Sequence, residues 1–185
     1  AAQCQQILGF EALIRWEPPT RGRVSPAEFI PIAEEVGLIG QIGEWALRTA
    51  CREASSWPSH ITVSVNVSPV QLLSSSLPHI VGAALAKSRL SPSRLELEVT
   101  ESIFLTDADG SLEVLKRLQA QGLRIALDDF GTGYSSLGYL NKAVFHKLKI
   151  DGSFVRESAS NKETVAIIQA IVQLDVVAYG PADIG

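Results

Sequence analysis

The sequence predicts an α/β protein in which parallel strands curl into a barrel. Strand-like and helix-like segments alternate along the chain, which is typical of parallel sheets whose strands are joined by helices. In addition, successive predicted strands have one apolar face and one polar face. An open sheet covered by helices on both sides has two apolar faces, whereas a barrel turns one face to its helices and the other to its interior. The two-faced strands therefore favour a barrel.

The expected elements follow one another in a regular order. Short apolar or β-branched runs predict strands over residues 7–16, 61–67, 94–101, 123–128, 147–151 and 175–179. Apolar residues at helical spacing predict helices over residues 25–37, 39–57, 77–90, 111–122 and near 162–174.

Several residues mark where the helices begin and end. Ser25, with Pro26 behind it and Glu28 three residues on, predicts a capping box at the start of the first helix. Ser68 and Gln71 repeat this chemistry after the strand over 61–67.

The two faces of each strand are read from alternate residues. The apolar face carries Val63, Val65, Val67, Leu95, Leu97, Val99, Ile125, Leu127, Leu148 and Ile150. The polar face carries Thr62, Ser64, Asn66, Glu96, Glu98, Thr100, Arg124, Ala126, Asp128, Lys147, Lys149 and Asp151. We expect the polar face to line the barrel interior and to converge on a site at the carboxyl ends of the strands.

Length and composition predict a single domain over residues 1–185. Hydrophobic residues make up 46% of the chain and charged residues 19%, as in ordinary globular proteins. The net charge of −4 argues against a surface for duplex nucleic acid. No apolar run approaches the ~20 residues of a membrane span. Cys4 and Cys51 match no metal or redox spacing, so we expect reduced thiols and a cytoplasmic protein.

The polar residues at the strand ends form an oxygen-rich set with one amine. They are Glu11, Asn66, Glu98, Asp128, Asp129, Lys149 and Asp151. Carboxylates with an amide suit hard cations such as Mg²⁺ or Mn²⁺. Any one acid at a strand end is more often a solvated side chain than a metal ligand. Asn66 alone could be explained by turn chemistry before Ser68, and Lys149 alone by an ion pair inside the barrel. The repetition over four successive strands favours a metal site.

The adjacent carboxylates of Asp128 and Asp129 repel one another, which indicates a cation between them. Alternation ends where a strand ends, so both side chains can turn into one pocket. Two metals held there would suit phosphodiester hydrolysis, because such pairs generate the attacking hydroxide and stabilise the leaving oxygen. Lys149 could orient or deprotonate the water, or neutralise phosphate charge.

Six stretches of the sequence resemble one known family. They are "FEALIRW", "FIPIAEEVGLI", "VNVSPVQL", "LELEVTES", "DDFGTGYSSLGYL" and "KLKIDGSFV". Together they are similar to the EAL domain, a modified TIM-type (β/α)8 barrel that hydrolyses cyclic di-GMP to linear pGpG in bacterial signalling. The resemblance covers about residues 9–172, in the family's order and spacing.

The resemblance implies a role for each matching position. Glu11, Asn66, Glu98 and Asp128 match ligands of a first Mg²⁺ or Mn²⁺, while Asp128 and Asp129 match ligands of a second. Lys149 matches the lysine that engages the nucleophilic water, with Asp151 beside it. Leu13 and Arg15 match contacts to the dinucleotide, and Glu101 matches the anchor of the "DFGTGYSS" loop. A homodimer and fused sensory domains are also implied.

The sequence departs from the family at both ends. The opening "AAQCQQ" does not supply the strand with a Gln-Pro pair that the family usually has there. Residues 173–185 match the family poorly, and Tyr179 stands where a glutamate that binds the second metal is expected. Val144 and His146 replace the family's usual Pro and Asp. The barrel therefore looks incomplete at both ends, either because stretches of a longer protein are omitted or because the domain is degenerate. The alternative functions are a catalytically impaired cyclic-di-GMP receptor or scaffold and, less well matched, an enolase-type lyase.

Overall fold

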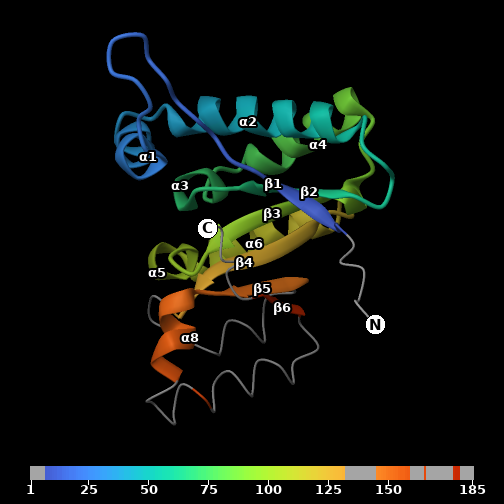
Figure 1. Cartoon of the computed structure of the whole chain (residues 1–185). Coiled ribbons are helices and arrows are strands. Elements are labelled where there is room, and N and C mark those ends of the chain that lie inside the picture. The colour runs from blue at the N-terminus through green and yellow to red at the C-terminus, as the bar shows by residue number, and fades with distance from the viewer. Residues whose placement is uncertain (1–6, 132–144, 159–164, 166–176, 180–185) are drawn as a thin grey trace, which may run out of the picture.

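The computed structural model of the chain describes residues 7–131, 145–158, 165 and 177–179. Within this part of the chain, six parallel strands form one sheet in sequence order (Figure 1). The strands are β1 (Gly9–Ala12), β2 (Thr62–Asn66), β3 (Leu95–Thr100), β4 (Arg124–Phe130), β5 (Lys147–Ile150) and β6 (Val177–Tyr179). Sequential parallel strands are the arrangement of a (β/α) barrel, so the predicted fold class is confirmed.

The described helices lie between β1 and β2, between β2 and β3, between β3 and β4, and between β5 and β6. They are α1 (Pro26–Glu35), α2 (Ile39–Ala54), α3 (Pro69–Leu72), α4 (Leu77–Ser88), the short 3₁₀ helix η1 (Pro92–Arg94), α5 (Ile103–Thr106), α6 (Ala108–Gln119) and α8 (Gly152–Ser158). The pattern did not predict the short helices α5 and α8. The helix expected near 162–174 lies outside the described residues apart from Val165.

The main core lies between the apolar face of the sheet and the helices. All ten residues predicted for the apolar face are buried, and Leu95, Leu97, Ile125 and Leu148 are almost fully so. Leu47 of α2 and Leu118 of α6 belong to the same cluster. Because this face is covered, the polar side chains of alternate residues must lie on the opposite, inner face.

Of the first predicted capping box, the Ser25 cap is present, but the return bond from Glu28 is not. The Ser25 hydroxyl caps α1 by accepting a bond from the Ala27 backbone amide at 3.3 Å. The Glu28 carboxylate instead accepts a bond from Arg21 at 3.0 Å, because the chain before α1 brings that guanidinium alongside. The second box, between Ser68 and Gln71, has both reciprocal bonds and is confirmed.

Two element boundaries differ from the prediction for identifiable reasons. Helix α6 begins at Ala108, earlier than expected, because the Asp107 carboxylate accepts a bond from the Gly110 amide at 2.9 Å and caps it. Strand β1 is shorter than the predicted 7–16, since Trp16 instead forms an antiparallel bridge with Val24.

The state of the one described cysteine and the length of the described helices bear on two expectations from the sequence. Cys51 is a free thiol that is fully buried, and this burial raises its pKa to about 11. Such a thiol is protonated and unreactive at neutral pH. Cys4 lies outside the described residues. Among the helices that the structure describes, none has the length and apolar character needed to cross a membrane.

The core predicts the effect of shortening a strand residue. Leu97→Ala in β3, where the side chain is 1% exposed, should lower the free energy of unfolding by about 3 kcal/mol, because it removes apolar contacts and leaves a cavity. Urea unfolding followed by circular dichroism measures the change. Leu105→Ala, at a position 64% exposed, is the matched control and should change it little. Equal losses in both variants would contradict the assigned core.

Candidate active site

Five polar side chains from five neighbouring strands meet at the carboxyl-terminal edge of the sheet. They are Glu11 of β1, Asn66 of β2, Glu98 of β3, Asp128 of β4 and Lys149 of β5. The parallel register brings them together: Asn66 pairs with Glu98, and Thr100, two residues beyond Glu98, pairs with Asp128. The sequence predicted this convergence, and the structure brings all five into one connected cluster.

The ammonium group of Lys149 is the centre of this cluster. Its Nζ donates to Asp128 Oδ2 at 2.7 Å and to Glu98 Oε2 at 2.8 Å. Glu11 Oε2 lies 3.8 Å from the same nitrogen. Asn66 Nδ2 in turn donates to Glu11 Oε1 at 2.7 Å, so the amide holds the carboxylate toward the centre. One cation thus links three strands directly and a fourth through Asn66.

Burial and charge oppose one another at this cluster. Burial is the main cause that raises the pKa of Glu98, and the hydrogen bond and charge of Lys149 counteract it only in part. Burial also disfavours the charged form of Lys149, but its hydrogen bonds with Asp128 and Glu98 prevail and raise its pKa well above the usual value. The lysine is therefore an ammonium ion that neutralises carboxylates at neutral pH.

The second aspartate of the pair is displaced by a local break in β4. The register between β4 and β5 is irregular between Leu127 and Phe130, and Asp129 has a φ of 54°, in the left-handed region. The Asp129 amide donates to Asp128 Oδ1 at 2.9 Å. Desolvation raises the pKa of the Asp129 carboxyl, and the charges of Asp128 and Asp151 raise it further. The alternation is broken at this point as predicted, but inside the strand and not at its end, because β4 continues to Phe130.

Gly131 makes this turn possible. Its φ is 98°, and a Cβ built on it would lie 2.4 Å from the ring of Phe154 in α8. Only glycine accommodates both the backbone conformation and this close approach. The rest of the predicted "DFGTGYSS" loop, residues 132–136, lies outside the described residues.

Asp151 has a structural task that the strand-end pattern did not reveal. Its Oδ1 accepts bonds from the amide of Ser153 at 2.7 Å and from the Ser153 hydroxyl, and it caps the start of α8. These hydrogen bonds lower the pKa of the Asp151 carboxyl. A helix cap explains this acid without a ligand, and its role in substrate binding stays a prediction.

A hollow of about 310 Å³ adjoins the cluster. Leu13, Arg15, Asn66, Ser68 and Thr100 are among the residues that line it. Leu13 is 53% exposed, and the Arg15 guanidinium is also accessible, with one bond to the Ile14 carbonyl at 2.9 Å. An apolar side chain and a cation thus border this hollow, and Asn66 connects it to the cluster. The predicted contacts of Leu13 and Arg15 with a dinucleotide stay predictions.

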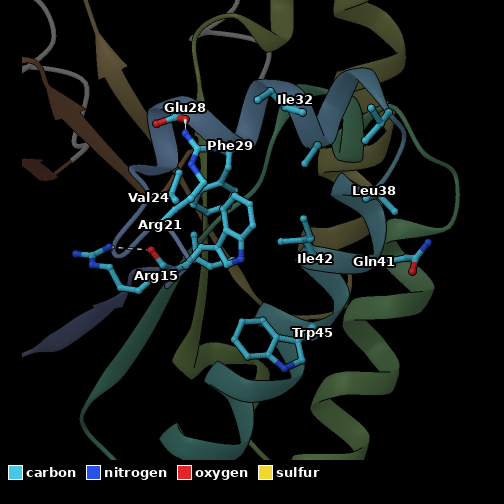
Figure 2. A pocket seen from close by; sticks show the side chains of 14 residues that line it. Arg15, Arg21, Val24, Glu28, Phe29, Ile32, Leu38, Gln41, Ile42 and Trp45 are labelled. Carbon is cyan, nitrogen blue, oxygen red and sulfur yellow. Dashed lines mark hydrogen bonds and ion pairs between the residues drawn. The ribbon is translucent and has the colours of Figure 1, made fainter. Parts of the chain in front are cut away.

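A larger hollow of about 610 Å³ lies away from the carboxylates, between α1, α2 and the segment after β1. Figure 2 shows Phe29, Ile32, Ile42 and Trp45 around it, with the ion pair between Arg21 and Glu28 at its margin. None of the cluster residues lines this hollow. Its walls are mostly apolar, and the carboxylate of Glu28 among them is paired with Arg21.

Glu101 is buried just beyond β3. It is 9% exposed, and its Oε2 has no hydrogen-bond partner. The loop that it is predicted to anchor lies outside the described residues, so that role stays a prediction.

A second polar layer lies beneath the cluster, and the sequence reading assigned it no role. Ser64, Glu96 and Lys147 each stand two residues before a cluster residue on the same strand, and they join through Glu96 Oε1. The signal was present in the sequence, because all three lie on the predicted polar face. What was missing was their contact across the barrel interior.

Comparison with known proteins agrees with this architecture. The family model of the EAL domain matches residues 1–175. The chain belongs to the EAL domain family. This EAL domain is 46% identical over 172 residues to the bifunctional diguanylate cyclase/cyclic di-GMP phosphodiesterase MucR of Pseudomonas aeruginosa, and it is 50% identical over 169 residues to the uncharacterized protein y4lL of Sinorhizobium fredii.

The matches differ in how much of each relative they cover. They include 91% of this chain, but only 25% of MucR and 20% of y4lL, so the EAL domain spans a quarter or less of these relatives. A solved structure described as the PaMucR phosphodiesterase in complex with c-di-GMP superimposes with a TM-score of 0.85 and 44% identity, over 95% of this chain and 74% of that one.

The cluster predicts the effect of removing its cation. Lys149→Met should lower the free energy of unfolding by about 3 kcal/mol, because it leaves the buried Glu98 carboxylate without its ammonium partner. Urea unfolding at neutral pH in the presence of a chelator measures the change. Lys87→Met, at an exposed position on α4, is the control. If the two variants lose equal stability, Lys149 does not balance the cluster.

Proposed function

We propose that this EAL domain is a divalent-metal-dependent phosphodiesterase that hydrolyses cyclic di-GMP to linear pGpG. The observation that carries the proposal is the convergence of oxygen ligands and one lysine from five strands at the carboxyl-terminal edge of the sheet, where barrel enzymes have their active sites. The similarity to a phosphodiesterase solved with c-di-GMP supports the choice of substrate.

The donor set fits a hard divalent cation by its chemistry. Glu11, Asn66, Glu98 and Asp128 offer carboxylate and amide oxygens, which Mg²⁺ and Mn²⁺ prefer. Among the described residues no three acids, histidines or cysteines are arranged to hold a metal. The Lys149 ammonium lies against the carboxylates of Glu11, Glu98 and Asp128. The carboxylates therefore already surround a positive charge. Asp129, next to Asp128, would serve a second cation.

The proposed reaction adds water across one phosphodiester bond of the cyclic dinucleotide, which opens the ring. Bound divalent cations would lower the pKa of a water molecule and neutralise phosphate charge. Lys149, as an ammonium donor held by Glu98 and Asp128, would orient the water and stabilise charge on the phosphate oxygens. Asn66 would keep the Glu11 carboxylate turned to the centre.

The hollow beside the cluster would receive the rest of the substrate. Arg15 at its rim would pair with a phosphate, and Leu13 would contact an apolar face of the dinucleotide. Glu101 would anchor the loop after β4, for which its buried oxygen without a partner is the supporting observation. Asp151 would act beside Lys149, although its helix cap limits its freedom. Homodimerisation and fused sensory domains also remain proposals.

The second candidate function is a receptor that binds cyclic di-GMP with impaired hydrolysis. The register pairs Tyr179 of β6 with Lys149, at the position where the resemblance implies a glutamate for the second metal. A tyrosine there would weaken that metal. The retained carboxylates and lysine favour the enzyme, and an assay of turnover beside binding separates the two functions.

Glu11→Ala should reduce hydrolysis of cyclic di-GMP by about a thousandfold, because it removes an oxygen ligand and its charge from the reacting centre. The assay quantifies linear pGpG over time with Mn²⁺, and addition of a chelator should abolish the product of the unchanged protein. Glu17→Ala, at an exposed surface ion pair, is the control. Full activity of Glu11→Ala would refute the site, and binding without any product from the unchanged chain would favour the receptor.

Asp128→Asn should reduce turnover by about a hundredfold or more, because the neutral amide weakens both the proposed cation sites and the hold on Lys149. Steady-state kinetics with Mn²⁺ measures kcat. Asp109→Asn, exposed on α6, provides the matched loss of one charge and should leave kcat unchanged. A wild-type kcat in Asp128→Asn would exclude Asp128 from the reaction.

A further inference from the structure

The second polar layer, formed by Ser64, Glu96 and Lys147, repeats the cluster one step lower in the barrel. Lys147 Nζ lies 2.5 Å from Glu96 Oε1, and the Ser64 hydroxyl donates to the same oxygen at 3.0 Å. The Glu96 side chain is only 3% exposed. Each lysine of β5 therefore reaches across β4 to a glutamate of β3, Lys147 to Glu96 and Lys149 to Glu98.

Ala126 of β4 leaves the space that this reach requires. It pairs with Lys147 on one side and with Glu98 on the other. Since its side chain ends at Cβ, it leaves room for the Lys147 side chain to pass toward Glu96. At the level above, Asp128 fills the corresponding space and accepts a bond from Lys149.

The two layers are close enough to compete for cations. Residues two apart on a strand are separated by about 6.6 Å, and a lysine side chain has four flexible methylene groups. A buried carboxylate without a partner is strongly unfavourable, so an unpaired Glu96 would attract the nearest ammonium group. In this structure Lys147 pairs with Glu96, and Lys149 remains at the edge of the sheet.

We propose that Lys147 is a positioning residue for the hydrolysis of cyclic di-GMP. By pairing with Glu96, it prevents that carboxylate from drawing Lys149 down into the barrel, and so keeps the Lys149 ammonium between Glu98 and Asp128. This inference rests on the proposed function of the site. A purely structural ion pair would be equally sensitive to the loss of either partner, whereas this role makes the two partners unequal.

The test compares the partners singly and together. Lys147→Met should lower kcat tenfold or more with little change in KM, because Lys149 leaves its place. Glu96→Gln alone should keep kcat within about threefold of the wild type, since the amide oxygen still accepts bonds but carries no charge. The double variant should recover most of the loss caused by Lys147→Met. Lys87→Met is the control for loss of an exposed lysine.

Two results would overturn the proposal. One is that Glu96→Gln impairs kcat as strongly as Lys147→Met. The other is that the double variant is no better than Lys147→Met. If Lys147→Met fails to fold, the double variant is compared with Glu96→Gln. A kcat ten times lower in the double variant would overturn the proposal, because Lys147 would then be needed even when residue 96 carries no charge.

Crystal structures provide a readout that does not depend on activity. In Lys147→Met, Lys149 Nζ should lie within hydrogen-bond distance of Glu96, and in the double variant it should return to Glu98 and Asp128. If Lys149 keeps its wild-type contacts in Lys147→Met, the proposal is wrong. An inactive wild-type chain would defeat the proposed function alone, since these structures still decide where the ammonium lies.

Discussion

The contact of one lysine with carboxylates from three strands is the interaction on which this site depends. Lys149 approaches Glu98 and Asp128 at hydrogen-bond distance and Glu11 slightly farther away. Without a cation, three carboxylates at one edge of a sheet would repel one another and resist burial. With it, they are held close enough to act on one ligand. The requirement for charge balance therefore explains both the stability of the site and its suitability for a divalent cation.

The parallel register determines which residues can take part in this balance. In a sheet of sequential strands, every second residue of each strand faces the barrel interior, and equal steps along neighbouring strands reach the same level. Moving two residues toward the amino terminus from Lys149 and Glu98 leads to Lys147 and Glu96, which form a second ion pair. The interior is thus a stack of polar layers in which each lysine needs a carboxylate of its own.

Much of this arrangement could be predicted because it depends on periodicity. The alternation in β2 to β5 indicated the buried face and the inner face, and strand ends indicated Glu11, Asn66, Glu98, Asp128 and Lys149. The partner that each polar side chain bonds was harder to predict. Glu28 pairs with Arg21 rather than completing a capping box, and Asp151 caps α8. Which partner a side chain selects depends on groups that only the folded chain brings near, and no spacing rule contains that information.

The same reasoning bears on the choice between an enzyme and a receptor. A protein that only binds a dinucleotide needs groups around its phosphates and bases, but it has no need to hold three carboxylates against a part-buried ammonium. Burying Glu98 to 3% exposure desolvates its carboxylate, which is unfavourable, and the hydrogen bond and charge of Lys149 offset this in part. Tyr179 of β6 pairs with Lys149 in the backbone register and would bear on the proposed second cation. The contacts of Glu11, Glu98 and Asp128 with Lys149 are made by residues of β1, β3, β4 and β5. This buried charge supports the proposed enzyme over the receptor, because preorganised charges are what a reaction at phosphate uses.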